Sequence, residues 1–212
     1  ASPSHAQELL ADIRRLSPDP VTLVVNTHWH WDHAFGNSVF RPTTIWGHER
    51  CRERLLVDGT SARDELAAEE PGLRAAFEAV VIDPPDRTLT MAADLDVGGR
   101  RVELRYLGRG HTNGDIVVAV PDAAVLFAGD LLEAGATPWF GDGYPIDWPA
   151  TVGRLRSLAT GVVVPGHGAE SDRSLVERQL AEFRLVAALA RRVPAGRLDR
   201  AAFGAHDHLA RR

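Results

Sequence analysis

Apolar residues recur at helical spacing near the start of the chain, and the pattern then changes to that of a strand. The helical stripe consists of Leu9, Leu10, Ile13 and Leu16. Ser4 and Gln7 precede it at the spacing of a capping box, and Pro18 prevents its continuation. The β-branched, apolar run at residues 21–25 lies between helix breakers. We therefore expect a helix followed by a short buried strand.

Helical and strand patterns occupy separate blocks in the rest of the chain. A strand is predicted at residues 43–46, and the Arg-, Glu- and Ala-rich region 48–80 predicts helix with a break at residues 71–72. Strand patterns then follow at residues 95–97, 102–106, 116–120 and 125–127. Gly98-Gly99 predicts a tight hairpin turn between the first two.

The last predicted elements are a helix at residues 148–159, a strand at 162–164 and a helix at 174–192. Blocks of helices separated from blocks of strands are typical of an α+β fold, with layered sheets and helices packed outside them.

The composition is that of one globular domain, and we expect residues 1–212 to form it. A hydrophobic fraction of 44% and a charged fraction of 25% exclude disordered, collagen-like and coiled-coil chains. The net charge of −5 argues against nucleic-acid binding. No apolar run is long enough to span a membrane and no signal peptide precedes the first helix, which favours a cytoplasmic location. No feature indicates an oligomeric state.

Among the residue types that bind metals, His is frequent in the chain and Cys is rare. The chain contains nine His, one Cys and no Lys. A single Cys excludes a disulfide framework and a multi-Cys zinc site. Any metal ion would therefore be held by imidazole nitrogen and carboxylate oxygen.

The strongest motif is His-Trp-His-Trp-Asp-His at residues 28–33, directly after the predicted strand at 21–25. Imidazole and carboxylate together suit zinc and related divalent ions. A chance polar turn is the alternative, and the position at the end of a strand argues against it. Three further Gly-containing turns follow predicted strands and contain His111, Asp130 and His167. Glycine beside a ligand lets the backbone approach the site closely.

These motifs, in the order His-x-His-x-Asp-His, Gly-His-Thr, Gly-Asp and Pro-Gly-His-Gly, resemble the metallo-β-lactamase superfamily over about residues 9–183. The resemblance implies an αββα sandwich, in which two mixed sheets lie face to face with helices outside. It also implies two Zn²⁺ ions at one edge, with Fe or Mn as alternative metals. The first ion would be held by His28, His30 and His111, the second by Asp32, His33 and His167, and Asp130 would bridge both.

Two features depart from the family pattern. Only 27 residues precede His28, so we expect the first sheet to lack one or two N-terminal strands. Residues 107–168 are similar to the zinc β-lactamases that place Cys in the second site, but here Asp130 stands in that position, and Cys51 lies elsewhere. Glu133 stands where those enzymes commonly have a Lys that binds the carboxylate of the drug. The ligand set is nearer to that of glyoxalase II.

The resemblance implies a dinuclear zinc hydrolase that uses a metal-bridging hydroxide on an ester, thioester, lactone or amide-like bond of a small molecule. Asp32 is the candidate catalytic residue, because it is placed to orient the hydroxide as well as to bind metal. Three alternatives stay open: a mononuclear iron enzyme that oxidises persulfides, a β-lactam hydrolase, and a metal-binding module without turnover.

Candidates for substrate binding lie in and beside the same loops: Trp31, Asn113, Trp139, Phe140 and Tyr144. The last three are candidates for an aromatic wall, with ordinary loop anchoring as the alternative, and Asn113 is also typical of a plain turn. Thr112 and Asp115 follow His111 and are candidates for orienting its imidazole. The remaining histidines are expected at the surface: His5, His48, His206 and His208.

Overall fold

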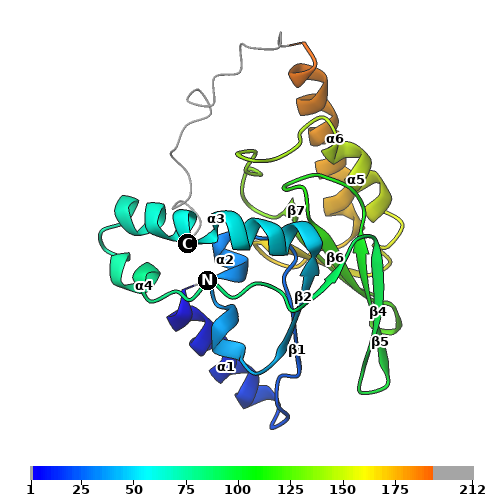
Figure 1. The fold of residues 1–212 in the computed structure, drawn as a ribbon. Coiled ribbons are helices and arrows are strands. Elements are labelled where there is room, and N and C mark those ends of the chain that lie inside the picture. Colours follow the sequence, from blue (N-terminus) through cyan, green and yellow to red (C-terminus); the bar gives the residue numbers. More distant parts are fainter. Residues whose placement is uncertain (1, 193–212) are drawn as a thin grey trace. The chain divides into compact units, whose positions relative to one another are not determined.

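The computed structural model describes residues 2–192, and the chain divides into two compact units, residues 1–92 and 93–212 (Figure 1). Each unit contains one sheet with helices, so the predicted α+β class is confirmed. His206 and His208 lie outside the described residues. Within residues 2–192, no helix combines the length and the apolar character that a membrane crossing requires.

The first unit contains a small parallel sheet and most of the predicted helices. Its elements are α1 (Pro3–Leu16), β1 (Leu23–Val25), α2 (Trp31–Ala34), a 3-10 helix (Asn37–Phe40), β2 (Thr44–His48), α3 (Glu49–Glu69), α4 (Arg74–Glu78) and β3 (Arg87–Leu89). The strands lie in the order β1-β2-β3, all parallel. The break between α3 and α4 falls at the predicted Pro71-Gly72.

Helix α1 begins earlier than the sequence pattern predicts. Its N-cap is Ser2, whose hydroxyl accepts a hydrogen bond from the backbone N–H of His5, and Pro3 occupies the first turn. The capping box at Ser4 and Gln7 is therefore wrong, because proline already supplies the fixed φ of a first helical residue. Among the residues of α1 only Ala6 is buried.

The core of the first unit lies between α2, α3 and the chain after α4. Its buried members are Ala34, Phe35, Cys51, Leu55 and Val80. Cys51 is a core residue of α3 with an exposed fraction of 1%, as expected for a small apolar side chain without a metal-binding role.

His48 is buried, which corrects the expectation that it lies at the surface. Its exposed fraction is 1%, and it is the N-cap of α3, where Nδ1 accepts a hydrogen bond of 3.1 Å from the N–H of Arg50. Nε2 lies 3.1 Å from the carbonyl oxygen of Thr90 and donates to it, since the other ring nitrogen is the acceptor. Burial lowers the pKa of this imidazole below its ordinary value.

We expect His48 to make the first unit less stable in acid. Because its pKa is lowered in the folded chain, the unfolded chain takes up the proton more readily, and the free energy of unfolding decreases as the pH falls below about 6.5. Replacing His48 by Asn keeps an N-cap side chain that does not titrate, so part of the loss between about pH 7.5 and pH 5.5 should disappear. Urea unfolding at both pH values measures this.

The matched control is Val57→Asn, because Val57 is 77% exposed on the same helix α3 and carries no titratable group. That variant should keep the pH dependence of the wild type. An unchanged pH dependence in His48→Asn would contradict the assignment of the acid sensitivity to His48.

The second unit contains a five-stranded mixed sheet, a short α-helix and a long α-helix. Its elements are β4 (Ala92–Val97), β5 (Arg100–Tyr106), β6 (Ile116–Val120), a 3-10 helix (Pro121–Ala123), β7 (Val125–Glu133), α5 (Trp148–Leu155), β8 (Val162–His167) and α6 (Arg173–Ala190). The strand order is β4-β5-β6-β7-β8. Strands β5, β6 and β7 pair antiparallel, and β7 pairs in parallel with β8.

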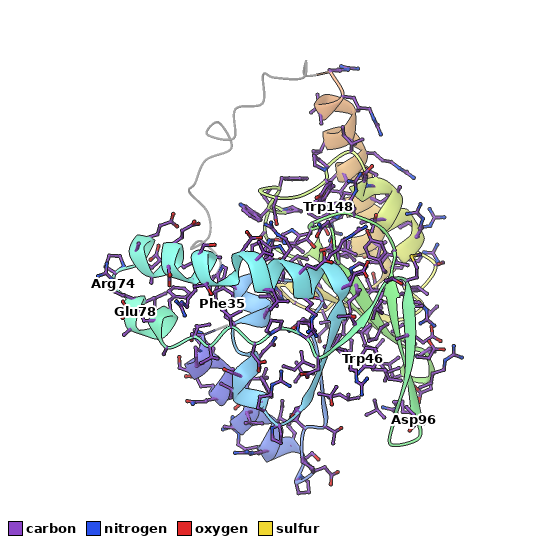
Figure 2. The ribbon with its side chains drawn as sticks, viewed as in Figure 1. Phe35, Trp46, Arg74, Glu78, Asp96 and Trp148 are labelled. Atoms are coloured by element: carbon purple, nitrogen blue, oxygen red, sulfur yellow. The ribbon has the colours of Figure 1, made fainter. Side chains whose placement is uncertain are left out.

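The hairpin between β4 and β5 turns where the sequence predicts. Gly98 and Gly99 have φ of 61° and 83°, which L side chains rarely adopt. The carboxylate of Asp96, labelled at the end of the hairpin in Figure 2, accepts a hydrogen bond of 3.0 Å from the N–H of Gly99.

The core of the second unit lies between the sheet and helices α5 and α6, which run side by side (Figure 1). Its largest side chain is Trp148, labelled in Figure 2, which is fully buried. The Trp148 ring stacks on Phe183 at 4.5 Å between centroids. Its Nε1 donates a hydrogen bond of 3.2 Å to the carbonyl oxygen of Leu131 in β7, so α5 is tied to the strand that also contains Asp130.

Candidate metal centre

The motif of residues 28–33 forms a tight loop between β1 and α2. His30 is the N-cap of α2, a single turn that contains Asp32 and His33. Nε2 of His28 lies 3.1 Å from Nδ1 of His30, and Nε2 of His33 lies 3.2 Å from Oδ2 of Asp32. The rings of His28 and His33 are 4.3 Å apart. The first unit thus brings together all four of its predicted ligands.

Two buried asparagines that the sequence analysis missed support this loop. The side-chain amides of Asn26 and Asn37 exchange two hydrogen bonds of 2.9 and 2.8 Å. Asn26 also donates to the carbonyl oxygen of His33, and Asn37 donates to that of Asp83. Such a reciprocal pair satisfies buried polar groups and fixes the loop. The sequence could have identified Asn26 as a supporting residue, because it is a polar residue directly after the apolar strand.

The first imidazole is also oriented by its neighbour. Nδ1 of His28 lies 3.1 Å from the hydroxyl of Thr27. This contact at one ring nitrogen directs Nε2 toward His30. A hydrogen bond at the second nitrogen is the usual way in which a protein sets the tautomer and direction of a metal-binding His.

The second unit brings together its three predicted ligands, His111, Asp130 and His167. Nε2 of His111 lies 3.4 Å, and Nε2 of His167 lies 3.3 Å, from Oδ2 of Asp130. His111 and Asp130 are buried, with exposed fractions of 1% and 4%. Nδ1 of His111 lies 3.2 Å from the carbonyl oxygen of Trp139, which directs Nε2 toward Asp130.

Thr112 and Asp115 support the His111 loop through its backbone. The carboxylate of Asp115 accepts hydrogen bonds from the N–H of Thr112, at 3.0 and 2.9 Å, and from its hydroxyl, at 2.6 Å. The hydroxyl of Thr112 in turn accepts from the N–H of Gly114. The group that contacts Nδ1 of His111 is instead the backbone of Trp139, which no sequence motif identifies.

Strand β7 continues beyond the predicted end at residue 127 and includes Asp130. Its pairing with β8 is irregular, with the partners Phe127–Val164, Gly129–Pro165 and Glu133–His167. β7 therefore advances six residues (127 to 133) while β8 advances three (164 to 167). Gly129 adopts φ of 55° within this irregular stretch. Such bulges redirect side chains, often beside functional sites.

Glu133 belongs to the same cluster, although the sequence analysis considered it only as a replacement for Lys. His111, Asp130 and Glu133 each offer a ligand atom within 4.8 Å of the others, and all three are buried. The sequence did not indicate that Glu133 lies near Asp130. The two residues are three positions apart, and residues i and i+3 of a regular strand point to opposite faces of the sheet.

The spacing of the donor atoms within each unit fits shared binding of a metal ion by each donor pair. Two donors that share one tetrahedral zinc ion at about 2.0–2.1 Å lie roughly 3.3–3.4 Å apart. The four donor pairs, two in each unit, lie 3.1, 3.2, 3.4 and 3.3 Å apart. Nitrogen and carboxylate donors are also the types that zinc, iron and manganese accept in proteins.

The tryptophans of the first motif pack against the core of their unit. The ring of Trp31 lies edge-to-face on Phe77 at 5.5 Å, and both Trp29 and Trp31 pack on the cluster around Phe35. The guanidinium of Arg54 lies 4.6 Å from the Trp29 ring.

The three residues of the candidate aromatic wall contact different groups. Phe140 packs edge-to-face on Trp148 and Phe183, as a loop anchor does. Tyr144 lies under the guanidinium of Arg109 at 4.5 Å. The Trp139 ring lies 6.0 Å from that of His111 and is half-buried. Asn113 is half-buried in the loop after His111.

Comparisons with known proteins agree with this geometry. The family model described as the metallo-beta-lactamase superfamily matches residues 2–167. A metallo-beta-lactamase type 2 of Bacillus cereus is 27% identical over 175 residues, which are 80% of this chain and 60% of that protein. A hydroxyacylglutathione hydrolase of Erythrobacter litoralis is 26% identical over 138 residues, which are 65% of this chain and 45% of that protein. The chain thus spans about 60% or less of these curated relatives.

Solved structures show the same fold. A metallo-beta-lactamase from Pontibacter korlensis superposes with a TM-score of 0.66 at 27% identity, over 84% of this chain and 76% of that one. The predicted fold is therefore confirmed. The family match covers most of the chain, including every predicted metal ligand. The chain belongs to the metallo-beta-lactamase superfamily.

Proposed function

We propose that the chain is a dinuclear zinc-dependent hydrolase that cleaves an ester, thioester, lactone or amide-like bond. The observation that carries the proposal is the set of four donor pairs 3.1–3.4 Å apart, two in each unit. Membership of the family supports joining the two sets of donors into one centre. Residues 1–212 would then act as a single domain, because neither unit alone supplies all the ligands.

The proposed ligands follow the family pattern. The first ion is held by His28, His30 and His111, the second by Asp32, His33 and His167, and Asp130 bridges the two. When bound, two such ions supply Lewis acidity and a water molecule of lowered pKa.

The two aspartates have different tasks in this proposal. Asp130 is buried, with an exposed fraction of 4%, so its carboxylate serves only as a ligand. The side chain of Asp32 is 26% exposed, so a carboxylate oxygen can accept a hydrogen bond from the attacking water and hold it toward the scissile carbon. No Ser or Cys nucleophile is required.

β-Lactam hydrolysis is the second candidate, because curated relatives are named metallo-beta-lactamases. Asp130 and Glu133 argue against it. They stand where the Cys-type lactamases have Cys and a carboxylate-binding Lys, so this chain has neither the thiolate ligand nor the cation that binds the drug at those positions. We therefore expect turnover of β-lactams to be much slower than turnover of the best ester or thioester.

The test combines a metal count with a substrate panel. Elemental analysis should find two zinc ions per chain, and a panel of esters, thioesters, lactones, phosphodiesters and β-lactams should identify a substrate. Asp32→Ala should lower turnover by roughly 100-fold or more, in the range of a lost acid–base group. Asp64→Ala is the matched control, since the Asp64 side chain is 61% exposed on α3.

Each contrary result has a definite meaning. Hydrolysis that survives in Asp32→Ala would overturn the dinuclear mechanism. One iron per chain, with oxygen consumed on persulfides, would replace it by an oxidoreductase. Full metal loading without turnover across the panel would favour a metal-binding module.

A further inference from the structure

Glu133 carries a carboxylate that the proposed mechanism does not use. The residue is 1% exposed, and both carboxylate oxygens are shielded from solvent. Burying a carboxylate is costly unless a cation or hydrogen-bond donors compensate for the lost hydration. A bound cation is one such compensation, and the geometry around Glu133 allows one.

Two neighbours of Glu133 belong to the proposed centre. A ligand atom of Glu133 lies within 4.8 Å of one on His111 and one on Asp130. Two carboxylates at this separation cannot both stay ionised at low cost unless a positive charge lies near them; otherwise one of them holds a proton. A divalent cation bound beside the imidazole of His111 supplies that charge.

Glu103 of the same sheet shows how the unit treats a carboxylate away from this cluster. Its side chain is 15% exposed and forms ion pairs with Arg101 at 2.9 Å and Arg105 at 2.8 Å. Glu133 is more deeply buried than Glu103, beside an aspartate and a histidine.

The irregular end of β7 aims Glu133 into the cluster. The register changes between Gly129 and Glu133, where β7 passes four residues (129 to 133) against two of β8 (165 to 167). This irregularity allows Asp130 and Glu133, three positions apart, to reach the same place. Glu133 itself pairs with His167, another proposed ligand.

Helix α6 fixes the backbone of Glu133 through one buried side chain. Oε1 of Gln179 accepts a hydrogen bond of 3.0 Å from the N–H of Glu133, and Nε2 of Gln179 donates one of 2.5 Å to its carbonyl oxygen. The N–H of Ala134 donates to the carbonyl oxygen of His167, which ties the ends of β7 and β8 together. A ligand held on rigid elements in this way is positioned before the metal binds.

We propose that Glu133 supplies a carboxylate oxygen to the ion held by His111 and Asp130. This inference rests on the proposed metal centre. It makes the centre richer in oxygen, with carboxylates from Asp32, Asp130 and Glu133. Manganese prefers carboxylate ligands to imidazole ligands, whereas zinc binds imidazole readily. An additional carboxylate from Glu133 should therefore raise the affinity for Mn²⁺ relative to that for Zn²⁺.

The test measures metal affinity rather than turnover. The full chain is freed of metal with a chelator and titrated separately with Zn²⁺ and Mn²⁺. Glu133→Gln should weaken the affinity for one ion by roughly 100-fold, the upper end of the effect of losing an outer-shell partner, and Mn²⁺ should lose more than Zn²⁺. Glu103→Gln is the matched control and should bind both metals like the wild type.

Stability without metal separates a ligand from a structural residue. Removing a buried charge next to Asp130 should leave the metal-free Glu133→Gln at least as stable as the metal-free wild type, while the stabilisation gained on adding metal shrinks. If Glu133→Gln does not fold, Glu133→Asp keeps the charge with a shorter reach and should fold with weakened metal affinity.

Three results would overturn one proposal or the other. Wild-type affinity in Glu133→Gln would overturn the role of Glu133 as a ligand. Loss of metal-free stability in Glu133→Gln with unchanged metal affinity would make the residue structural. A wild type that binds neither ion would instead overturn the proposed metal centre itself.

Discussion

Gly166→Ala is expected to abolish tight metal binding at the centre. Gly166 directly precedes His167 in β8, and an added Cβ would overlap Oδ1 of Asp130 and press on the backbone of residues 129 and 130. Because Asp130 lies on a buried strand, its carboxylate must move away from His111 and His167. We expect metal affinity to fall by more than the roughly 10–100-fold that an outer-shell change costs. Titration of the metal-free protein with Zn²⁺ measures it.

Gly153→Ala provides the matched control for this substitution. Gly153 lies within α5 of the same unit, and nothing lies within 4 Å of the added methyl group. Alanine in a helix is favoured over glycine by about 1 kcal/mol, so this variant should be slightly more stable and bind metal normally. A folded Gly166→Ala that binds Zn²⁺ like the wild type would show that Asp130 is not a ligand.

Several elements could be predicted from the sequence because their patterns are local, whereas α2, β3 and the extension of β7 were not predicted. The stripe in α1, the break at Pro71-Gly72 and the turn at Gly98-Gly99 each depend on a few neighbouring residues, and all three occur in the structure. The ligand loops were predictable for the same reason. Metal-capable residues beside glycine at the ends of apolar runs form a pattern along the chain, and the structure brings these residues together within each unit.

Properties that depend on contacts distant in sequence could not be predicted. His48 resembles a surface residue at a helix start, and its burial depends on Thr90, 42 positions away. The position of Glu133 depends on the register change in β7, because regular alternation would place its side chain on the other face of the sheet from Asp130. The amide pair of Asn26 and Asn37 likewise requires the fold to bring the end of β1 and the start of the 3-10 helix together.

Trp148→Ala should cause the largest loss of stability in the second unit. The side chain is fully buried and stacks on Phe183, so its removal leaves a large cavity, which typically costs about 3–5 kcal/mol. The carbonyl oxygen of Leu131 also loses its hydrogen bond. The free energy of unfolding is best followed by urea titration with far-UV circular dichroism, since the substitution itself changes tryptophan fluorescence.

Two further variants separate packing from the metal centre, because the Trp148 ring also lies edge-to-face on His111 at 5.6 Å. Trp148→Phe keeps most of the volume and loses the N–H, so it should cost about 1–3 kcal/mol, the range for an unsatisfied buried carbonyl. Leu189→Ala on α6, where Leu189 is 62% exposed, should stay within about 0.5 kcal/mol of the wild type. If Trp148→Ala also lay within about 1 kcal/mol of the wild type, α5 would not be held by this core. Metal affinity should fall in Trp148→Ala and recover in Trp148→Phe, because an aromatic ring again supports the imidazole of His111.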